Sequence, residues 1–361
     1  MFKLYRAPLR AYQLITLAFT FVLLSLNITA AQANQTAVKD TYKVFILHSY
    51  ELDHVCGQPQ SAGVTEALNN SGFSGKRLTI EAYAMDTKRT NTTPESIAAQ
   101  AEIALQRISE FQPDVLVTLD DNAFYSVVDA LEDPTLPVVF SGLNNLPGPD
   151  TQTRWLQSRK QPGANVTGVY EKIHFVTAVQ VQRNINTELR KMLVLSDNSP
   201  TGKALIRQIR EELQQNPLDI EFEYRITDSW EEYQQFITEA NASDINSLYP
   251  VALRLIDRQG KTYTGNEILQ WTAKHSRKPS IPLNFSFVQL GLFGGAGVDF
   301  HAMGYQAGLK AAAILQGEEP GNIPIDDARR YALVFNLPRA RNLGIEIPQD
   351  ILLAADIVYT E

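Results

Sequence analysis

The chain has 361 residues, of which 44% are hydrophobic and 20% charged, with 32 basic against 40 acidic residues and a net charge of −8 at pH 7. This acidic balance excludes the basic footprint of a nucleic-acid-binding protein and offers no basic face to anionic lipid, so we expect no nucleic-acid partner. The single cysteine, Cys56, excludes an intramolecular disulfide, and without a paired cysteine or an evident base beside it we expect an unreactive thiol.

Residues 1–33 have the pattern of a secretory signal peptide. Lys3, Arg6 and Arg10 precede an apolar stretch at 14–26, and small residues surround Ala33. The stretch of about 13 residues is shorter than the roughly 20 that a membrane-spanning helix needs. We therefore expect cleavage near Ala33 and a periplasmic mature chain, whose net charge falls from −8 to −11 because the three basic residues are lost.

The first half of the mature chain alternates short apolar runs with longer amphipathic stretches. Runs at 44–47, 78–82, 115–119 and 137–140 are rich in β-branched residues and predict strands. Thr93 and Pro94 open a helix whose apolar residues recur at helical spacing until Pro113. This alternation is typical of βα units on a parallel sheet.

A second series of such units follows a break at 146–165, where Pro, Gly and polar residues show no periodicity and indicate a long connection. Strands are expected at 166–169, 192–195 and 220–224, and a helix opens at Ser199 and Pro200. The rest of the chain offers an apolar segment at 282–287, a glycine-rich turn at 291–297, a helix at about 302–315 and a strand with short helical pieces at 332–359.

The predicted fold is α/β, with two Rossmann-like lobes that are built on parallel sheets and joined by a hinge. About 328 residues remain without the leader, more than the roughly 250–300 that one hydrophobic core usually serves. We expect lobe 1 at 34–164 with a returning segment around 282–300, and lobe 2 at 165–281 with a C-terminal segment around 301–361.

Polar and aromatic residues follow seven of the predicted strands, at the sheet edge where α/β proteins gather their ligands. The candidate ligand-binding residues are Ser49, Tyr50, Asp86, Asp121, Asn122, Ser141, Gly142 and Asn144 in the first lobe, and Tyr170, Asp197, Asp228 and Asn284 in the second. These side chains suit a small polar or zwitterionic ligand. We expect Ser141 and nearby N–H groups to hold a carboxylate, and an aspartate of the second lobe to pair with an ammonium. Helix capping is the alternative role for the acidic and hydroxyl residues.

No catalytic residue, metal or cofactor is expected. His48 and Ser49 are neighbours on an extended segment and face opposite sides, and nothing fixes Asp120 and Asp121 at a separation suited to glycoside hydrolysis. The five histidines show no metal-binding spacing, and no G-x-S-x-G motif occurs. The glycine-rich turn at 291–297 lacks the Lys and Ser/Thr of a phosphate-binding loop.

Several stretches resemble the ABC transporter substrate-binding protein family of the periplasmic type I fold, which includes binding proteins for aromatic amino acids. Residues 44–50, 113–123 and 137–145 look like its first lobe, 165–169 like the crossover, and 297–308 and 335–356 like its C-terminal part. Asn144 and Asn145 stand where amino-acid-binding members commonly carry Thr-Asp, and the loop at 249–260 also departs from their pattern. In these departures the chain is similar to extracellular sensor domains of kinases.

The resemblance implies a monomer that closes about its hinge over a small-molecule ligand, an amino acid or similar zwitterion. One hypothesis is that the closed form delivers the ligand to the membrane permease of an ABC transporter. An alternative is that it presents the bound state to a membrane sensor, a kinase or cyclase, without transport. An envelope enzyme is a third class, and it would turn over a substrate at a pH-dependent rate.

Overall fold

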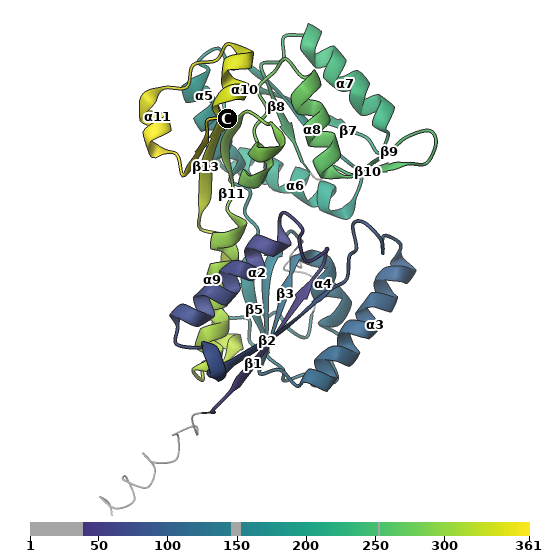
Figure 1. Ribbon diagram of the computed structural model, residues 1–361, viewed down its shortest axis with the longest axis vertical. Coiled ribbons are helices and arrows are strands. Elements are labelled where there is room, and N and C mark those ends of the chain that lie inside the picture. The colour runs from purple at the N-terminus through teal and green to yellow at the C-terminus, as the bar shows by residue number, and fades with distance from the viewer. Residues whose placement is uncertain (1–38, 146–152, 252) are drawn as a thin grey trace, which may run out of the picture. The chain divides into compact units, whose positions relative to one another are not determined.

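The computed structural model describes residues 39–145, 153–251 and 253–361 (Figure 1). The expected signal peptide at 1–33 and residues 146–152 of the connection expected at 146–165 lie outside the described residues. Residues Thr41–Glu361 form one compact unit. Within the described parts, no helix combines the length and the apolar character needed to cross a bilayer.

Lobe 1 is built on a six-stranded sheet in the order β12-β5-β4-β3-β1-β2, in which all neighbouring strands are parallel. Its strands are β1 (Tyr42–His48), β2 (Leu78–Ala84), β3 (Val115–Leu119), β4 (Val138–Leu143), β5 (Val166–Tyr170) and β12 (Asp326–Asp327). Every residue of β3 and β4 is buried, because helices cover both faces of the sheet.

The helices of lobe 1 are α2 (Gly57–Asn70), α3 (Pro94–Phe111), α4 (Asp120–Val127) and α9 (Phe300–Leu315), with short 3-10 turns η1 (Gly75–Arg77) and η3 (Pro320–Asn322). Helices α2 and α9 lie side by side although they are far apart in the sequence (Figure 1). Three glycines make this possible, since a methyl group on Gly63, Gly304 or Gly308 would collide with the other helix.

Lobe 2 contains two three-stranded sheets. The first has the order β7-β6-β8 and is parallel, with β6 (Lys191–Ser196), β7 (Glu221–Ile226) and β8 (Ser247–Pro250). The second has the order β11-β13-β14, with β11 (Gly294–Val298), β13 (Tyr331–Asn336) and β14 (Ile357–Tyr359). Strands β11 and β13 are antiparallel, a pairing that the expectation of purely parallel sheets does not include.

The remaining elements of lobe 2 surround these sheets. They are α5 (Phe175–Ile185), α6 (Pro200–Gln215), α7 (Trp230–Ala242), α8 (Gly265–His275), η2 (Phe285–Leu290), α10 (Leu337–Leu343), α11 (Gln349–Ala354) and the small pair β9 (Leu255–Ile256) and β10 (Thr262–Tyr263). The aromatic side chains of Trp230, Tyr233, Tyr263 and Trp271 stack between α7, α8 and β10.

The chain divides between the lobes differently from the boundaries expected from the sequence. Strand β5 completes the first sheet, so the chain leaves lobe 1 after Tyr170 rather than at residue 165. The segment expected to return to lobe 1 around 282–300 instead forms β11 in lobe 2, and the chain returns as α9 and β12. The reason is packing: the glycines of α9 match Gly63 of α2, a fit that the periodicity of one segment does not reveal.

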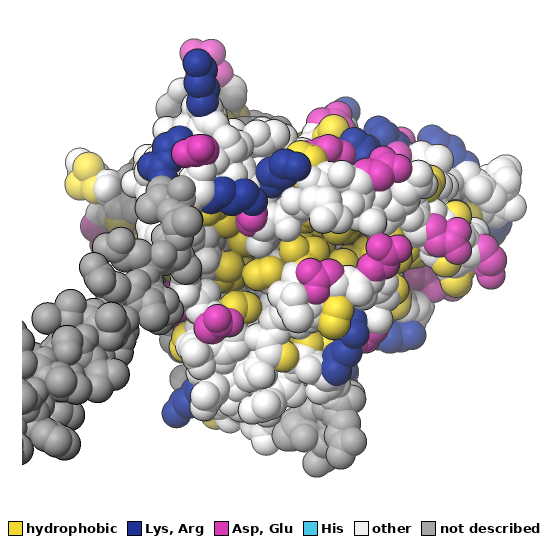
Figure 2. All heavy atoms as spheres, turned by 90° about the horizontal axis from the view of Figure 1, so that it is seen from below, with side chains coloured by type: hydrophobic (Ala, Val, Ile, Leu, Met, Phe, Trp, Pro, Cys, Tyr) yellow, Lys and Arg dark blue, Asp and Glu magenta, His cyan; other side chains and the backbone are white. Residues whose placement is uncertain are grey.

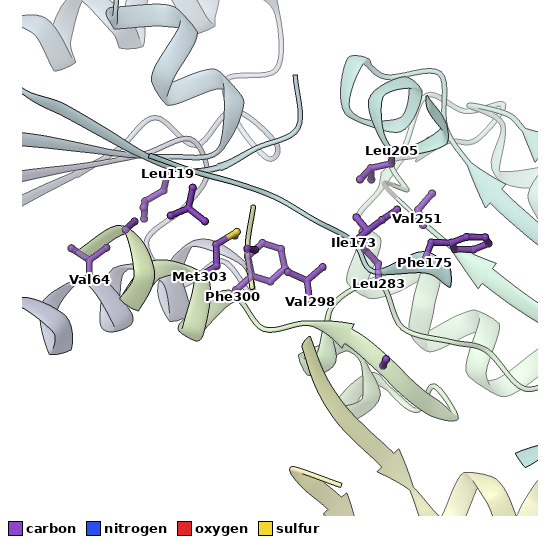
Figure 3. Packing of buried hydrophobic residues seen from close by; sticks show 14 of the residues in the cluster. Val64, Leu119, Ile173, Phe175, Leu205, Val251, Leu283, Val298, Phe300 and Met303 are labelled. Atoms are coloured by element: carbon purple, nitrogen blue, oxygen red, sulfur yellow. The ribbon is translucent and has the colours of Figure 1, made fainter. Parts of the chain in front are cut away.

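Three crossings therefore join the lobes: 171–174 between β5 and α5, Asp299 between β11 and α9, and 328–330 between β12 and β13. The first and third are linked, because the Ala328 N–H donates to the Tyr170 carbonyl at 2.8 Å and His174 Nε2 lies 3.0 Å from the Ala328 oxygen. A buried apolar cluster follows the second crossing, where Val298, Phe300 and Met303 lead from the lobe-2 core toward Leu119 (Figure 3). These crossings are the hinge.

Candidate functional site

Buried polar side chains gather where β3, β4 and β5 end in lobe 1, because parallel neighbours bring their carboxyl ends to one sheet edge. Asp120, Asn144 and Glu171 are 3%, 5% and 4% exposed. Asp121 completes the group, which we call the acidic cluster: Asp120, Asp121, Asn144 and Glu171. Among the described residues, no lysine, arginine or histidine nitrogen forms an ion pair within 4 Å of its three carboxylates. Buried carboxylates without a countercharge are costly, which points to a ligand as their partner.

Asp120 opens α4 with φ +65°, a left-handed conformation that non-glycine residues rarely adopt. Gln60 Nε2 donates to its Oδ1 at 3.3 Å, whereas the buried Oδ2 has no partner among the described residues. Burial raises the pKa of Asp120 to about 7, and the charge of Lys88 and the Gln60 hydrogen bond offset part of that rise. The side chain therefore has a free oxygen and titrates near neutrality.

Asp121 fixes the loop that follows β4. Its Oδ1 accepts from the backbone N–H groups of Asn144 at 3.1 Å and Asn145 at 3.2 Å. Burial raises the pKa of Asp121 to about 6, while these backbone hydrogen bonds act in the opposite direction. Asp121 thus positions Asn144 as well as adding negative charge.

Asn144 and Glu171 face each other across β4 and β5. Asn144 Nδ2 donates to Glu171 Oε2 at 3.1 Å, and the buried Asn144 Oδ1 has no partner within the described parts of the chain. Burial raises the pKa of Glu171 to about 8, and the charge of Asp120 adds to the rise. Asn144 Oδ1 and Asp120 Oδ2 are hydrogen-bond acceptors that await a donor, as an ammonium would provide.

Tyr50 borders this cluster with an aromatic surface. It is 6% exposed, packs against His54 with 4.4 Å between ring centroids, and carries the Lys88 ammonium 3.9 Å from its own centroid. Burial raises the pKa of the Tyr50 phenol, and the negative charges of Asp120 and Asp121 raise it further. The ring is therefore close enough to the carboxylates to feel their field.

Other predicted residues of lobe 1 hold the edge of the sheet together. Ser49 Oγ donates to the Leu119 carbonyl and accepts from the Ala123 N–H, both at 2.7 Å, and Ser141 Oγ donates to Gln60 Oε1 at 2.7 Å. The hydroxyl hydrogen of Ser141 is thus used in a hydrogen bond within the lobe and is not available to the expected carboxylate. Gly142 has φ +83°, and a methyl group there would lie 3.0 Å from Asp120 Oδ1 and from Gln60 Oε1.

Asp86 and Asn122 lie on the neighbouring loops. One oxygen of Asp86 accepts from Arg89 and Thr90, and its other oxygen is buried without a partner in the described residues. Asn122 Nδ2 donates to Thr87 Oγ1 at 2.8 Å.

The predicted residues of the second half do not meet at one place. Tyr170 ends β5 of lobe 1, where its hydroxyl donates to the Asn144 carbonyl at 2.8 Å. The carboxylate of Asp197 accepts from the backbone N–H groups of Ser199 and Arg254, and that of exposed Asp228 accepts twice from Asn198. Both aspartates hold loops, whereas helix capping, the alternative role that the sequence left open, falls to the neighbouring Ser199 and Ser229.

Three side chains of lobe 2 make contacts beside the acidic cluster. Arg207 of α6 donates to Asn145 Oδ1 at 2.7 Å, and Gln208 Nε2 donates to the Glu171 carbonyl at 2.9 Å. The predicted site residue Asn284 donates from Nδ2 to the Val55 carbonyl at 3.3 Å and lies 3.6 Å from the thiol of Cys56, whose pKa is raised by burial. Lobe 2 therefore contacts lobe 1 both at the loops that follow β4 and β5 and at the segment that precedes α2.

Sequence reasoning missed Asp120, Glu171 and Lys88 as site residues. Asp120 and Glu171 stood at strand ends with the others, but their burial without a countercharge has no signal in the sequence. His48, also at a strand end, is buried with neither ring nitrogen bonded to a described group, and burial lowers its pKa to about 4. Among the described side chains, no group of three or more His, Cys, Asp or Glu has a geometry that could hold a metal ion.

Comparison with known proteins gives a consistent result. A protein-family model described as ABC transporter substrate binding protein matches residues 49–359. The tyrosine-binding protein of Clostridioides difficile (strain R20291) is 20% identical over 297 residues, 82% of this chain and 79% of that protein.

Solved structures share the fold at low identity. An ABC domain from Streptococcus pneumonia in complex with L-Trp has a TM-score of 0.67 at 18% identity, covering 88% of this chain and 99% of that one. The ligand-free, open form of a substrate-binding protein with adhesive properties from Clostridium difficile has a TM-score of 0.66 at 17% identity, covering 89% and 100%. A conserved domain protein from Vibrio cholerae has a TM-score of 0.65 at 22% identity, covering 88% and 99%.

Proposed function

The chain belongs to the ABC transporter substrate-binding protein family, and from this we propose that it binds an amino acid in the periplasm and delivers it to the permease of an ABC transporter. Proteins of this family bind small molecules and are not enzymes. The expected two-lobed α/β fold of the periplasmic type I class is confirmed. Cleavage of the leader near Ala33 is part of the proposal.

The acidic cluster is the observation that carries the choice of ligand. It offers three carboxylates and the free acceptor oxygens of Asp120 and Asn144 at the ends of β3–β5. An ammonium donates three hydrogen bonds and brings the missing positive charge. The α-ammonium of an amino acid meets both needs, so lobe 1 binds this end of the ligand in our proposal, rather than an aspartate of lobe 2.

An aromatic side chain on the ligand would fit the same surroundings. The ring of Tyr50 lies beside the cluster, and offset or edge-on ring contacts add to the gain from burial. Of two similar proteins, one is a tyrosine-binding protein and the other forms a complex with L-Trp, which supports an aromatic amino acid as the ligand. We therefore propose Tyr50, Asp120, Asn144 and Glu171 as ligand contacts, with Asp121 and Tyr170 holding the Asn144 loop.

Binding couples to closure because lobe 2 approaches lobe 1 at the same edge. A ligand that contacts both lobes stabilises the closed form by its difference in affinity for the two forms. A permease would read the closed form. A membrane sensor could read it equally, and uptake of labelled ligand by cells with and without the protein separates transport from signalling.

A thermal-shift screen of the mature protein tests the proposed ligand. L-Tyrosine and L-tryptophan should raise the melting temperature. At a ligand concentration of 100 Kd, binding adds about 2.7 kcal/mol to the free energy of unfolding. Sugars, purines and the des-amino analogues of the two amino acids should leave it unchanged. A shift with the des-amino analogue as large as with the amino acid would contradict recognition of the ammonium.

A further inference from the structure

Lys88 places a cation at the edge of the acidic cluster. It follows β2, the neighbour of β1, and its ammonium lies 3.9 Å from the centroid of the Tyr50 ring. Its neighbour Arg89 turns away and pairs with Asp86 at 3.0 Å. Lys88 itself is exposed and forms none of the ion pairs found within 4 Å in the described residues, so its position depends on the aromatic face and on the field of the cluster.

Carboxylates of both lobes contribute to the negative field at Lys88. The ammonium of Lys88 acts on Asp120, Asp121 and Glu171 of lobe 1 and on Asp197 of lobe 2, and in each case it offsets part of the rise in pKa that burial causes. The charge of Lys88 also acts on His54 and Cys56, and His48 acts on His54. Asp120 and Asp121 act on Tyr50, Asp121 acts on Tyr125 and Tyr170, and Arg207 is a further cation that acts on Tyr170. Lys88 is thus the cation that all three carboxylates share.

We propose that Lys88 is a specificity-determining residue whose ammonium acts as an internal competitor for the ammonium of the ligand. Without ligand, Lys88 rests on the Tyr50 ring and supplies part of the positive charge that the acidic cluster lacks. An arriving primary ammonium can approach Asp120 Oδ2 and Asn144 Oδ1 more closely than Lys88 does, and takes over this role. A neutral or anionic solute cannot displace Lys88, so the competitor sharpens selection for ammonium-bearing ligands. This inference rests on the proposed function.

Removal of the competitor should tighten binding. Lys88→Met keeps the apolar stem and removes the charge, and an exposed cation–ring contact corresponds to about two- to fivefold in affinity. We would measure the Kd for L-tryptophan and L-tyrosine by calorimetry from pH 5.5 to 8.5. The lowest Kd in this pH series should fall by this factor in the variant. The loss of affinity toward acid should also begin at a higher pH, because the carboxylates lose a neighbouring cation.

Two matched variants make the result specific. Lys76→Met removes the same charge at η1, at the opposite end of β2, and should leave both the Kd and its pH profile as in the wild type. Lys88→Arg keeps a cation over the ring and should restore the wild-type Kd. A Kd for Lys88→Met that is unchanged or weaker at every pH would overturn the proposal, and a weaker one would indicate that Lys88 holds the carboxylate of the ligand.

A ligand-free measurement separates this inference from the proposed function. Carbon-13 NMR titration of the aspartate and glutamate carboxyls should show higher midpoints for the acidic cluster in Lys88→Met, but not in Lys76→Met. If the wild type binds neither amino acid, the proposed function fails while this shift still supports the placement of Lys88. If the midpoints do not move, the inference fails whether or not an amino acid binds.

Discussion

Glu171 is a buried carboxylate that opposes folding and, in the site that we propose, favours binding. It is 4% exposed, its Oε2 accepts from Asn144 Nδ2, and burial raises its pKa to about 8. A charge in such a place is costly until a cation arrives. The residue therefore indicates a site that is completed by its ligand.

The variant Glu171→Gln should separate these two effects. Loss of the charged acceptor should weaken amino-acid binding by about ten- to hundredfold, the usual range for a hydrogen bond to a charged group. The ligand-free protein should melt at a higher temperature at pH 8, because a neutral amide replaces a buried charge. Calorimetric titration and thermal melting of the same preparation test both signs, and a variant that loses stability as well as affinity would contradict this assignment.

The raised carboxyl pKa values also predict how stability depends on pH. Asp120 and Glu171 have pKa values of about 7 and 8 in the folded protein against 3.8 and 4.5 as unperturbed groups, so the folded state binds more protons and loses stability as pH rises through 7 and 8. His48 acts oppositely, but only between its lowered pKa of about 4 and its usual 6.5.

We therefore expect the melting temperature of the ligand-free protein to fall from pH 6.5 to pH 8.5, and to fall less in Glu171→Gln. Amino-acid affinity should change in the other direction over this range, because the ionised carboxylates are the form that binds an ammonium. Differential scanning calorimetry and titration calorimetry at matched pH values give the two slopes. Parallel slopes would argue against a shared set of carboxylates.

For individual residues, the sequence predicted the strand ends but not the roles of the residues that follow them. Tyr50, Asp121, Asn144 and Tyr170 were named from their positions after strands, and all four lie in or beside the acidic cluster. Ser49 and Ser141 were named for the same reason, but their hydroxyls bond within the lobe. A polar residue after a strand serves equally as a local hydrogen-bonding group or as a ligand contact, and only the geometry distinguishes the two.

Among the elements, the pair α2 and α9 shows what periodicity can and cannot predict. The helix expected at about 302–315 is present as Phe300–Leu315, and its sequence already indicates an apolar surface. Its partner could not be predicted, because the match between Gly63, Gly304 and Gly308 involves segments about 240 residues apart. The expected lobe boundaries depended on this partner, and they differ from the structure for that reason.

The variant Gly304→Ala tests the importance of this contact. The added methyl group would meet the Gln60 backbone, which cannot move as a side chain end can, so we expect a loss of about 1–3 kcal/mol in the free energy of unfolding. The control Gly265→Ala adds the same methyl group at the start of α8, where its nearest neighbour is the Leu253 carbonyl at 3.4 Å, and should not destabilise the protein. Denaturant unfolding compares the two, and equal stabilities would contradict the packing argument.

For the whole molecule, the contacts between the lobes determine how easily the closed form is reached. Arg207 of α6 is exposed and donates to Asn145 Oδ1, next to the acidic cluster. The first hinge crossing, 171–174, begins at Glu171 of the cluster, and a cavity of about 610 Å³ beside this crossing is lined by Lys172, His174, Glu212 and Asp327 among others. In the closure that we propose, contacts at both places would change, and no single stretch of sequence contains both.

The variant Arg207→Ala should favour the open form. An exposed polar contact of this kind contributes at most about 1 kcal/mol, so amino-acid affinity should fall by up to about fivefold. Small-angle X-ray scattering should show a larger radius of gyration without ligand and the wild-type value at saturation. Arg210→Ala, on the same helix, is the control, and an unchanged radius in both variants would contradict a role for Arg207 in closure.

The order of the segments along the chain has a consequence for biogenesis. Helix α9 covers α2, and β12 is the last strand of the first sheet, yet both are encoded after most of lobe 2. The first lobe thus cannot complete its fold while the ribosome is still translating the middle of the message. For the export that we propose, this delay would leave the nascent chain unfolded, the state in which a chain can pass through a secretion channel.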